Sequence, residues 1–236
     1  MVVTPAASTR AGMARDPPGW YGKLAMLGDF AQRRLPEHAV RRCDTWLSRA
    51  MAAGREHLAA NWLDVYLSAP VLRFAWAPGV LDELWWFGVV MPSCDQVGRY
   101  FPLLVAQSRT GAPADRIALD HLELWFEHLA QAALQTLQEH AVLDHFESAL
   151  RNAPPWPTPG QARPLTPRQA HGARRFTFGA STSLQEAMQA LASRNLMAHL
   201  QGVSLWWRQP GPVGAPTLSL VQGLPEAAGF ADLLLD

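Results

Sequence analysis

The segment Met91–Leu103 holds the side chains with the clearest chemical potential in this chain of 236 residues. It carries a thiol at Cys94, a carboxylate at Asp95 and a guanidinium at Arg99, followed by the phenol of Tyr100. Asp95 and Arg99 are four residues apart, so a helical turn would bring their charges together, whereas an extended turn would separate them. Three roles stay open for this pair: stabilising the loop, facing a protein partner, or catalysis.

A second candidate carboxylate is Asp29, which follows Gly28 in a turn-forming pair. An aspartate at such a position commonly caps a turn through its own backbone. A hydrolase would need Asp29 and Asp95 to converge in one cleft with a histidine, because acid–base catalysis needs its groups within hydrogen-bond reach. Cys94 would need a depressed pKa to react, and Arg99 is the nearby cation that could lower it.

Other patterns for catalysis or metal binding are weak. The chain has no Gly-x-Ser-x-Gly turn, and Gly22-Lys23 lacks the preceding gap and the following hydroxyl of a phosphate-binding loop. His140 and Asp144 have the spacing of metal ligands on a helix, but two ligands do not make a site. We therefore expect no catalytic residues, no cofactor and no metal, and we expect partner binding at Asp29, Asp95, Arg99 and Tyr100.

Short apolar runs alternate with amphipathic segments along the chain, which predicts an α/β fold. We expect strands at 20–24, 71–76, 85–91, 101–107, 174–178, 203–208 and 218–221. We expect helices at 36–58, 61–68, 184–200 and 226–235, and a longer helical stretch at 115–150 that is one rod or two pieces meeting near His140. The strands at 85–91 and 101–107 have no helix between them, so antiparallel pairing is the simpler prediction.

Paired tryptophans indicate how the sheet is covered. Trp85-Trp86 and Trp206-Trp207 each fall in a predicted strand, where adjacent side chains point to opposite faces. If both members of a pair are buried, both faces of the sheet must be covered. We therefore predict a three-layer α-β-α sandwich around a mixed, largely antiparallel sheet.

Composition sets the remaining limits. The chain is 49% hydrophobic and 17% charged with zero formal net charge, which argues against a nucleic-acid partner. It has no apolar run long enough for direct membrane insertion, and its two cysteines suit a reducing, cytoplasmic location. We expect a disordered tail at 1–16 and a single domain at 17–236 with a Pro-rich loop at about 151–173.

Several short motifs occur in order along the chain: Gly19–Leu24, Gly28–Phe30, Ala69–Val71 with Arg73-Phe74, Ala77–Gly79, Gly88-Val89 with Met91–Ser93, Asp95, Val97–Arg99 and Phe101–Leu103, then Ser204–Trp207, Gly223–Pro225 and Phe230. Together these motifs resemble the TagF (ImpM-like) family, accessory proteins of the bacterial type VI secretion system. The resemblance is dense over about 19–107 and sparse over about 203–234.

The resemblance implies an α-β-α sandwich and a post-translational repressor of type VI secretion. It also implies that repression comes from binding, and so sequestering, a forkhead-associated scaffold protein of the apparatus. Two alternatives stay open: a structural or accessory subunit of the apparatus, and a hydrolase using Asp29 and Asp95.

Overall fold

A computed structural model describes residues 16–113, 115–156, 168–170, 173–209, 215–226, 229–230 and 233. Most of the expected N-terminal tail (1–15), the centre of the expected Pro-rich loop (157–167) and much of the expected helix at 226–235 lie outside the described residues.

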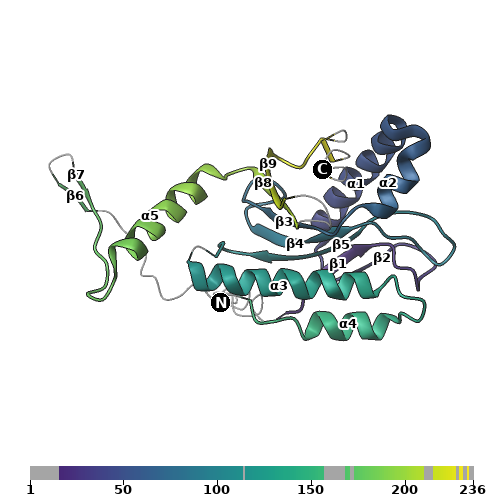
Figure 1. Cartoon of the computed structure of the whole chain (residues 1–236), viewed down its shortest axis with the longest axis horizontal. Helices are drawn as coiled ribbons and strands as arrows, with labels where there is room; N and C mark the ends of the chain where they lie inside the picture. Colours follow the sequence, from purple (N-terminus) through teal and green to yellow (C-terminus); the bar gives the residue numbers. More distant parts are fainter. Residues whose placement is uncertain are drawn as a thin grey trace, which may run out of the picture.

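A seven-stranded sheet forms the centre of the protein (Figure 1). Its strands lie in the order β2-β1-β5-β4-β3-β8-β9, and every pair of neighbours is antiparallel. The strands are β1 (Gly19–Gly22), β2 (Ala31–Arg33), β3 (Leu72–Trp76), β4 (Trp85–Met91), β5 (Leu103–Arg109), β8 (Val203–Arg208) and β9 (Thr217–Gln222). The predicted antiparallel pairing of the strands at 85–91 and 101–107 is confirmed, with Val89 opposite Val105.

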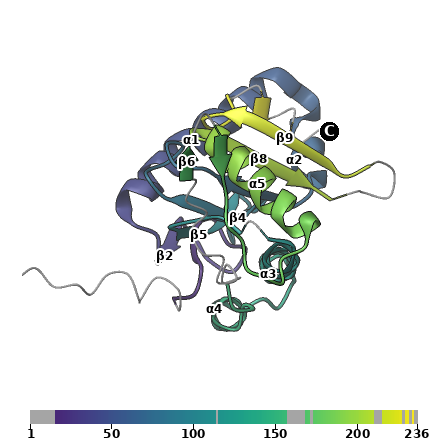
Figure 2. The ribbon, with the colours of Figure 1, turned by 90° about the vertical axis from the view of Figure 1, so that its left-hand side faces the viewer.

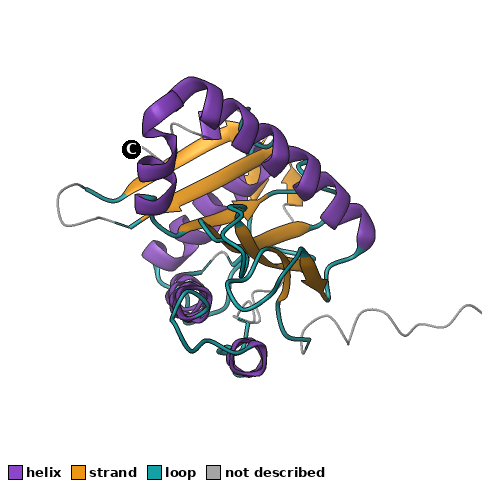
Figure 3. Cartoon of the chain, turned by 90° about the vertical axis from the view of Figure 1, so that its right-hand side faces the viewer, coloured by secondary structure: helices purple, strands orange, loops and turns teal. Residues whose placement is uncertain are grey.

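Helices cover both faces of this sheet, and Figure 3 shows the three layers from one end. On one face lie α1 (Glu37–Leu58), the 3-10 turn η1 (Ala59–Asn61) and α2 (Trp62–Ser68); on the other lie α3 (Arg116–Gln135) and α4 (Leu143–Arg151). Buried residues of α1 recur every three or four positions and pack on one side of the sheet, whereas those of α3 and α4 pack on the other. The predicted α-β-α sandwich is confirmed, with a sheet that is antiparallel throughout rather than mixed.

The helical stretch predicted at 115–150 consists of two helices, α3 and α4, so the prediction of two pieces meeting near His140 is confirmed. The Asp115 carboxylate caps α3 by accepting the backbone N–H of Ala118 at 2.8 Å. The chain leaves the helix at Thr136, whose hydroxyl donates to the carbonyl of Ala133 at 2.6 Å, and α4 begins at Leu143. The break lets α4 return beside α3 beneath the same face of the sheet (Figures 1 and 3).

The first tryptophan pair behaves as expected and the second does not. Trp85 and Trp86 are both buried, one in each core. Trp206 is buried between β8 and α1, but Trp207 is 39% exposed. The prediction of core for both members is therefore wrong for Trp207, because α3 packs over β4 and β5 and does not cover this end of the sheet.

A smaller unit stands apart from the sandwich. Helix α5 (Leu184–His199) extends away from it, with the two-stranded β6 (Arg168–Ala170) and β7 (Ala173–Arg175) beyond it, and Figure 2 views this arm end-on. Ser183 and Glu186 cap α5 reciprocally, with the hydroxyl accepting an N–H at 3.2 Å and the carboxylate accepting one at 2.7 Å.

Three local details differ from expectation. Asn61 makes no side-chain cap on α2, whose first turn is continuous with η1. The short strand β2 has no apolar alternation and was not predicted. The first predicted strand ends at Gly22, two residues early, because Lys23 and Leu24 leave the sheet. Within the described residues, no helix has both the length and the apolar character to cross a membrane.

Candidate functional site

The turn between β4 and β5 (residues 92–102) forms a small hairpin. The N–H of Asp95 donates to the carbonyl of Arg99, and the N–H of Phe101 donates to the carbonyl of Ser93, each at 3.1 Å. Gly98 closes the hairpin with φ +80°, a backbone angle that glycine adopts without steric cost.

Asp95 organises the hairpin from within, since its side chain is buried. Its Oδ2 accepts hydrogen bonds from Nζ of Lys23 at 2.8 Å and from Nε of Arg99 at 2.7 Å. Its Oδ1 accepts the backbone N–H groups of Val97 at 3.1 Å and Arg99 at 2.8 Å. Burial alone would raise the pKa of Asp95, but the hydrogen bonds from Lys23 and Arg99 outweigh it and hold that pKa well below its usual range. Asp95 is therefore an anion at neutral pH that joins Lys23 to the turn.

Lys23 reaches Asp95 from the end of β1, seventy-two residues away in sequence. The preceding Gly22 has φ +136°, and a Cβ there would lie 2.1 Å from the carbonyl oxygen of Pro102. Only glycine lets the two backbones approach this closely. The ammonium also lies 4.9 Å from the ring centroid of Phe30, so aromatic and acidic groups together compensate its burial.

Above this buried pair lies an exposed rim, here called the turn surface: Asp29, Phe30, Val97 and Arg99. Arg99 holds it together, because Nη2 donates to the carbonyl of Gly28 at 2.6 Å and lies 3.8 Å from the carboxylate of Asp29. Phe30 packs edge-on against Phe101 with ring centroids 4.8 Å apart, yet remains nearly half exposed.

The structure thus brings three of the four predicted residues together. Asp29 and Arg99 lie on the turn surface, and Asp95 lies beneath it, where it positions Arg99 and makes no contact with solvent. Tyr100 follows the hairpin half-buried, with its ring edge-on to Tyr66 at 5.9 Å. Asp95 is therefore a positioning residue rather than a contact residue.

The two candidate carboxylates accept hydrogen bonds from nearby backbone N–H groups. Asp95 accepts two backbone N–H groups, and Oδ1 of the exposed Asp29 accepts the N–H of Phe30 at 2.8 Å, so both carboxylates stabilise the local backbone. Burial and the adjacent Asp95 raise the pKa of the Cys94 thiol, which lowers its thiolate fraction. Across the part of the chain that the structure describes, no three His, Cys, Asp or Glu side chains gather as a metal site would need.

Comparison with known proteins gives the family and the solved structures that this chain resembles. The family model for the TagF N-terminal domain, type VI secretion system-associated, matches residues 19–153, more than half of the 236 residues. The chain belongs to the TagF family. A solved relative is PA0076 from Pseudomonas aeruginosa PAO1, determined at 2.05 Å resolution. It is 36% identical, with a TM-score of 0.74 over 92% of this chain and 93% of that one. No curated protein matches.

Two residues of this TagF-family protein that matter structurally were missed by reasoning from its sequence. Lys23 is the only lysine in the chain, and this was the one feature of the sequence that could have drawn attention to it. Glu147 gave no signal, because it stands in an ordinary amphipathic helix. It is nonetheless buried and accepts hydrogen bonds from Trp20 and Arg34, each at 2.6 Å, which fastens α4 to the N-terminal strands.

Proposed function

We propose that this TagF-family protein is a non-enzymatic, cytoplasmic repressor of type VI secretion. It acts by binding a forkhead-associated scaffold protein of the apparatus and withholding it from assembly. Family membership supports the link to type VI secretion. The observation that carries the binding role is the turn surface, an exposed patch held rigid from below by the buried Lys23–Asp95 pair.

The chemistry of the turn surface suits protein recognition. Phe30 and Val97 offer exposed apolar area, and Asp29 and Arg99 flank it with opposite charges. Protein interfaces combine an apolar centre with a polar rim in this manner, and aromatic and arginine side chains are enriched in them. The fixed position of Arg99 lowers the entropy lost on binding, because its guanidinium is already held at Asp95 and Gly28.

Val97 is the best residue for a test. Its side chain is exposed (69%), and its backbone N–H donates to Oδ1 of Asp95 whatever side chain stands at position 97, so Val97→Asp keeps the hydrogen bonds of Asp95. Arg99→Ala would instead remove two hydrogen bonds that shape the turn. The matched control is Ile117→Asp, another β-branched side chain at 70% exposure. It lies in the first turn of α3, beyond the opposite end of β5, where an aspartate suits the helix dipole.

The purified scaffold protein is immobilised and binding of the wild type and the two variants is measured. We expect Val97→Asp to weaken binding by roughly tenfold or more, because it would put a charge into exposed apolar area that the proposal assigns to the interface. Ile117→Asp should bind like the wild type. Unchanged binding by Val97→Asp would remove the turn surface from the proposal, and no binding by the wild type would remove the scaffold as the partner.

The regulatory part of the proposal has a genetic test. Deleting a repressor raises secretion of a reporter effector, whereas deleting a structural subunit abolishes it. Loss of secretion in the deletion strain would therefore favour the structural-subunit alternative. Complementation with Val97→Asp, if that variant is stable, should fail to restore repression, whereas Ile117→Asp should restore it.

A further inference from the structure

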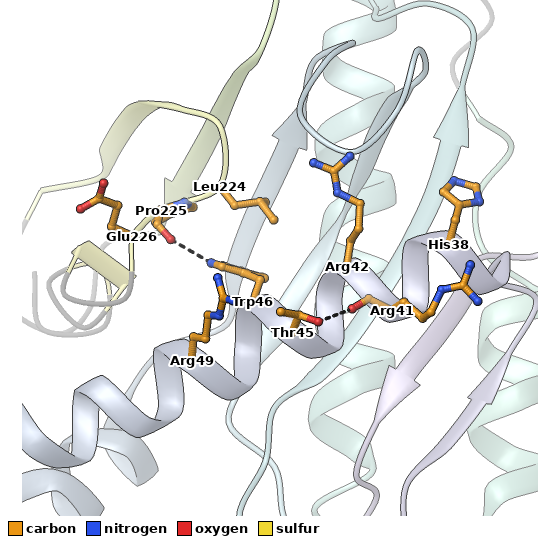
Figure 4. A pocket seen from close by; sticks show the side chains of 9 residues that line it. All are labelled: His38, Arg41, Arg42, Thr45, Trp46, Arg49, Leu224, Pro225 and Glu226. Carbon is orange, nitrogen blue, oxygen red and sulfur yellow. Dashed lines mark hydrogen bonds between the residues drawn. The ribbon is translucent and has the colours of Figure 1, made fainter.

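A hollow of about 720 Å³ lies along α1, between this helix and the segment that follows β9 (Figure 4). Its α1 side is a stripe of residues three or four positions apart: His38, Arg41, Arg42, Thr45 and Arg49. Its other side is formed by Leu224, Pro225 and Glu226. We call this hollow the α1 groove.

Positive charge dominates the α1 groove, since three arginines and one glutamate line it. Arg42 donates to the backbone carbonyls of Val80 and Leu81, which fix its guanidinium without neutralising it. Arg49 is exposed and has no carboxylate partner among the described residues.

Two further side chains of the α1 groove have partners near its N-terminal end. Arg41 pairs with Glu37, whose side chain is largely exposed, and His38 lies 2.9 Å from Asp82. The exposed Arg41–Glu37 pair contributes little stability, so Arg41 can exchange Glu37 for a better-placed anion. The groove therefore has positive charge that the carboxylates of the described residues leave unpaired at Arg49.

An apolar wall accompanies these charges. Trp46 closes the floor, with its indole N–H donated to the carbonyl of Pro225 at 2.9 Å, so the ring offers only apolar contact. Leu224 is partly buried beside it. The floor is rigid, because Trp46 also packs against Trp76, Trp206 and Phe230 with ring centroids 5.1 to 5.8 Å apart.

We infer that the α1 groove binds an acidic segment of a protein partner, with carboxylates on the arginine stripe and an apolar side chain against Trp46 and Leu224. Carboxylates match the planar, multiply donating guanidinium of arginine better than any other protein group. A nucleic acid fits less well, because the arginines form a single short row beside an apolar wall and Glu226 faces the same hollow.

This site is separate from the turn surface. Arg42 and His38 contact the loop between β3 and β4, whereas the turn surface lies between β4 and β5, at the other end of β4. The inference therefore goes beyond the proposed function and does not rest on it. Two surfaces at opposite ends of the sheet would allow two segments of a partner, or two partners, to bind at once.

The test uses the full chain and fluorescein-labelled peptides of about ten residues that alternate glutamate with leucine or phenylalanine. Fluorescence anisotropy should detect binding to the wild type, and peptides with lysine in place of glutamate should not bind. Arg49→Glu and the double variant Arg41→Glu/Arg49→Glu should weaken binding roughly tenfold or more, because each reversal replaces attraction with repulsion. Raising NaCl to about 0.5 M should weaken it as well.

The matched control is Arg116→Glu, an exposed arginine of α3 outside the groove. It should bind the acidic peptide like the wild type. Circular dichroism of each variant checks folding, and Arg49→Glu breaks no ion pair or side-chain hydrogen bond found among the described residues, so its fold should be unchanged. Absence of peptide binding by the wild type, or equal loss with Arg116→Glu, would overturn the inference. Stronger binding of a DNA duplex or of phosphatidylserine vesicles through the same arginines would overturn its assignment to a protein partner.

Discussion

Replacing Glu147 tests what fastens α4 to the N-terminal strands. Its buried carboxylate accepts the indole N–H of Trp20 and the guanidinium of Arg34, each at 2.6 Å. Glu147→Met keeps the volume and removes both acceptors. A buried indole N–H without an acceptor costs about 1–3 kcal/mol. Losing the ion pair adds only about 1 kcal/mol, because solvent screens the quarter-exposed Arg34 (25%). We therefore expect Glu147→Met to lower the free energy of unfolding by about 3 kcal/mol.

Urea denaturation followed by tryptophan fluorescence measures this loss. Glu147→Gln retains an oxygen that can accept from Trp20, so we expect it to lose only about 1 kcal/mol. Glu139→Gln, an exposed position between α3 and α4, should stay within about 0.5 kcal/mol of the wild type. Equal losses in the Met and Gln variants would refute the reasoning, because they would show that the Trp20 hydrogen bond contributes little.

The pKa of Glu147 adds a pH dependence with a definite sign. Burial alone would raise it, but the hydrogen bonds from Arg34 and Trp20 reverse the effect and bring the pKa of Glu147 below its ordinary value. Such a carboxylate contributes stability above the pKa of the unfolded chain, about 4.3, and this stability is lost as the pH falls through the folded pKa. Below about pH 4.3 the wild type should therefore lose stability more steeply than Glu147→Gln. Parallel curves would contradict this account.

Three further predictions concern the core and the turn. Gly88→Ala should lower the free energy of unfolding by about 3 kcal/mol in urea denaturation, because its Cβ would lie 2.0 Å from the carbonyl oxygen of Val105; a loss below about 1 kcal/mol would contradict the close packing of these strands. The Cys94 thiol, whose pKa is raised, should react with an aromatic disulfide reagent at pH 8 more slowly than free cysteine, and a faster reaction would indicate an activated thiol. Trp206→Ala should cost about 4 kcal/mol and Trp207→Ala about 1 kcal/mol, and the reverse order in thermal or urea unfolding would contradict the uncovered sheet end.

Periodicity alone was enough to predict most of the fold. Alternating and helical apolar patterns located the main strands and helices, because in this chain the buried faces follow those periods. The same argument failed at Trp207, since periodicity tells which face a side chain occupies and not how far the covering helix extends. It failed at β2 because that strand is short, polar and at the edge of the sheet.

The candidate site was only partly predictable for a related reason. In a loop no period fixes side-chain direction, so Asp95 and Arg99 could have pointed inward or outward. The deciding contact comes from Lys23, which is distant in sequence and enters only when β1 pairs with β5. The α1 groove was missed as well, because its arginines belong to the solvent-facing side of an ordinary amphipathic helix until the segment after β9 lies beside them.

The two surfaces differ in charge, and that difference determines what each can recognise. At the turn, the charges of Lys23 and Arg99 are balanced by Asp95 beneath them and by Asp29 beside them. A partner there gains little from long-range attraction and must fit the apolar side chains and the fixed guanidinium. In the α1 groove the arginines outnumber the acidic residues that line it. The inferred acidic segment would therefore be attracted electrostatically before it makes contact. Under the two proposals, this chain of zero formal net charge selects one partner surface by shape, at the turn surface, and another by charge, in the α1 groove.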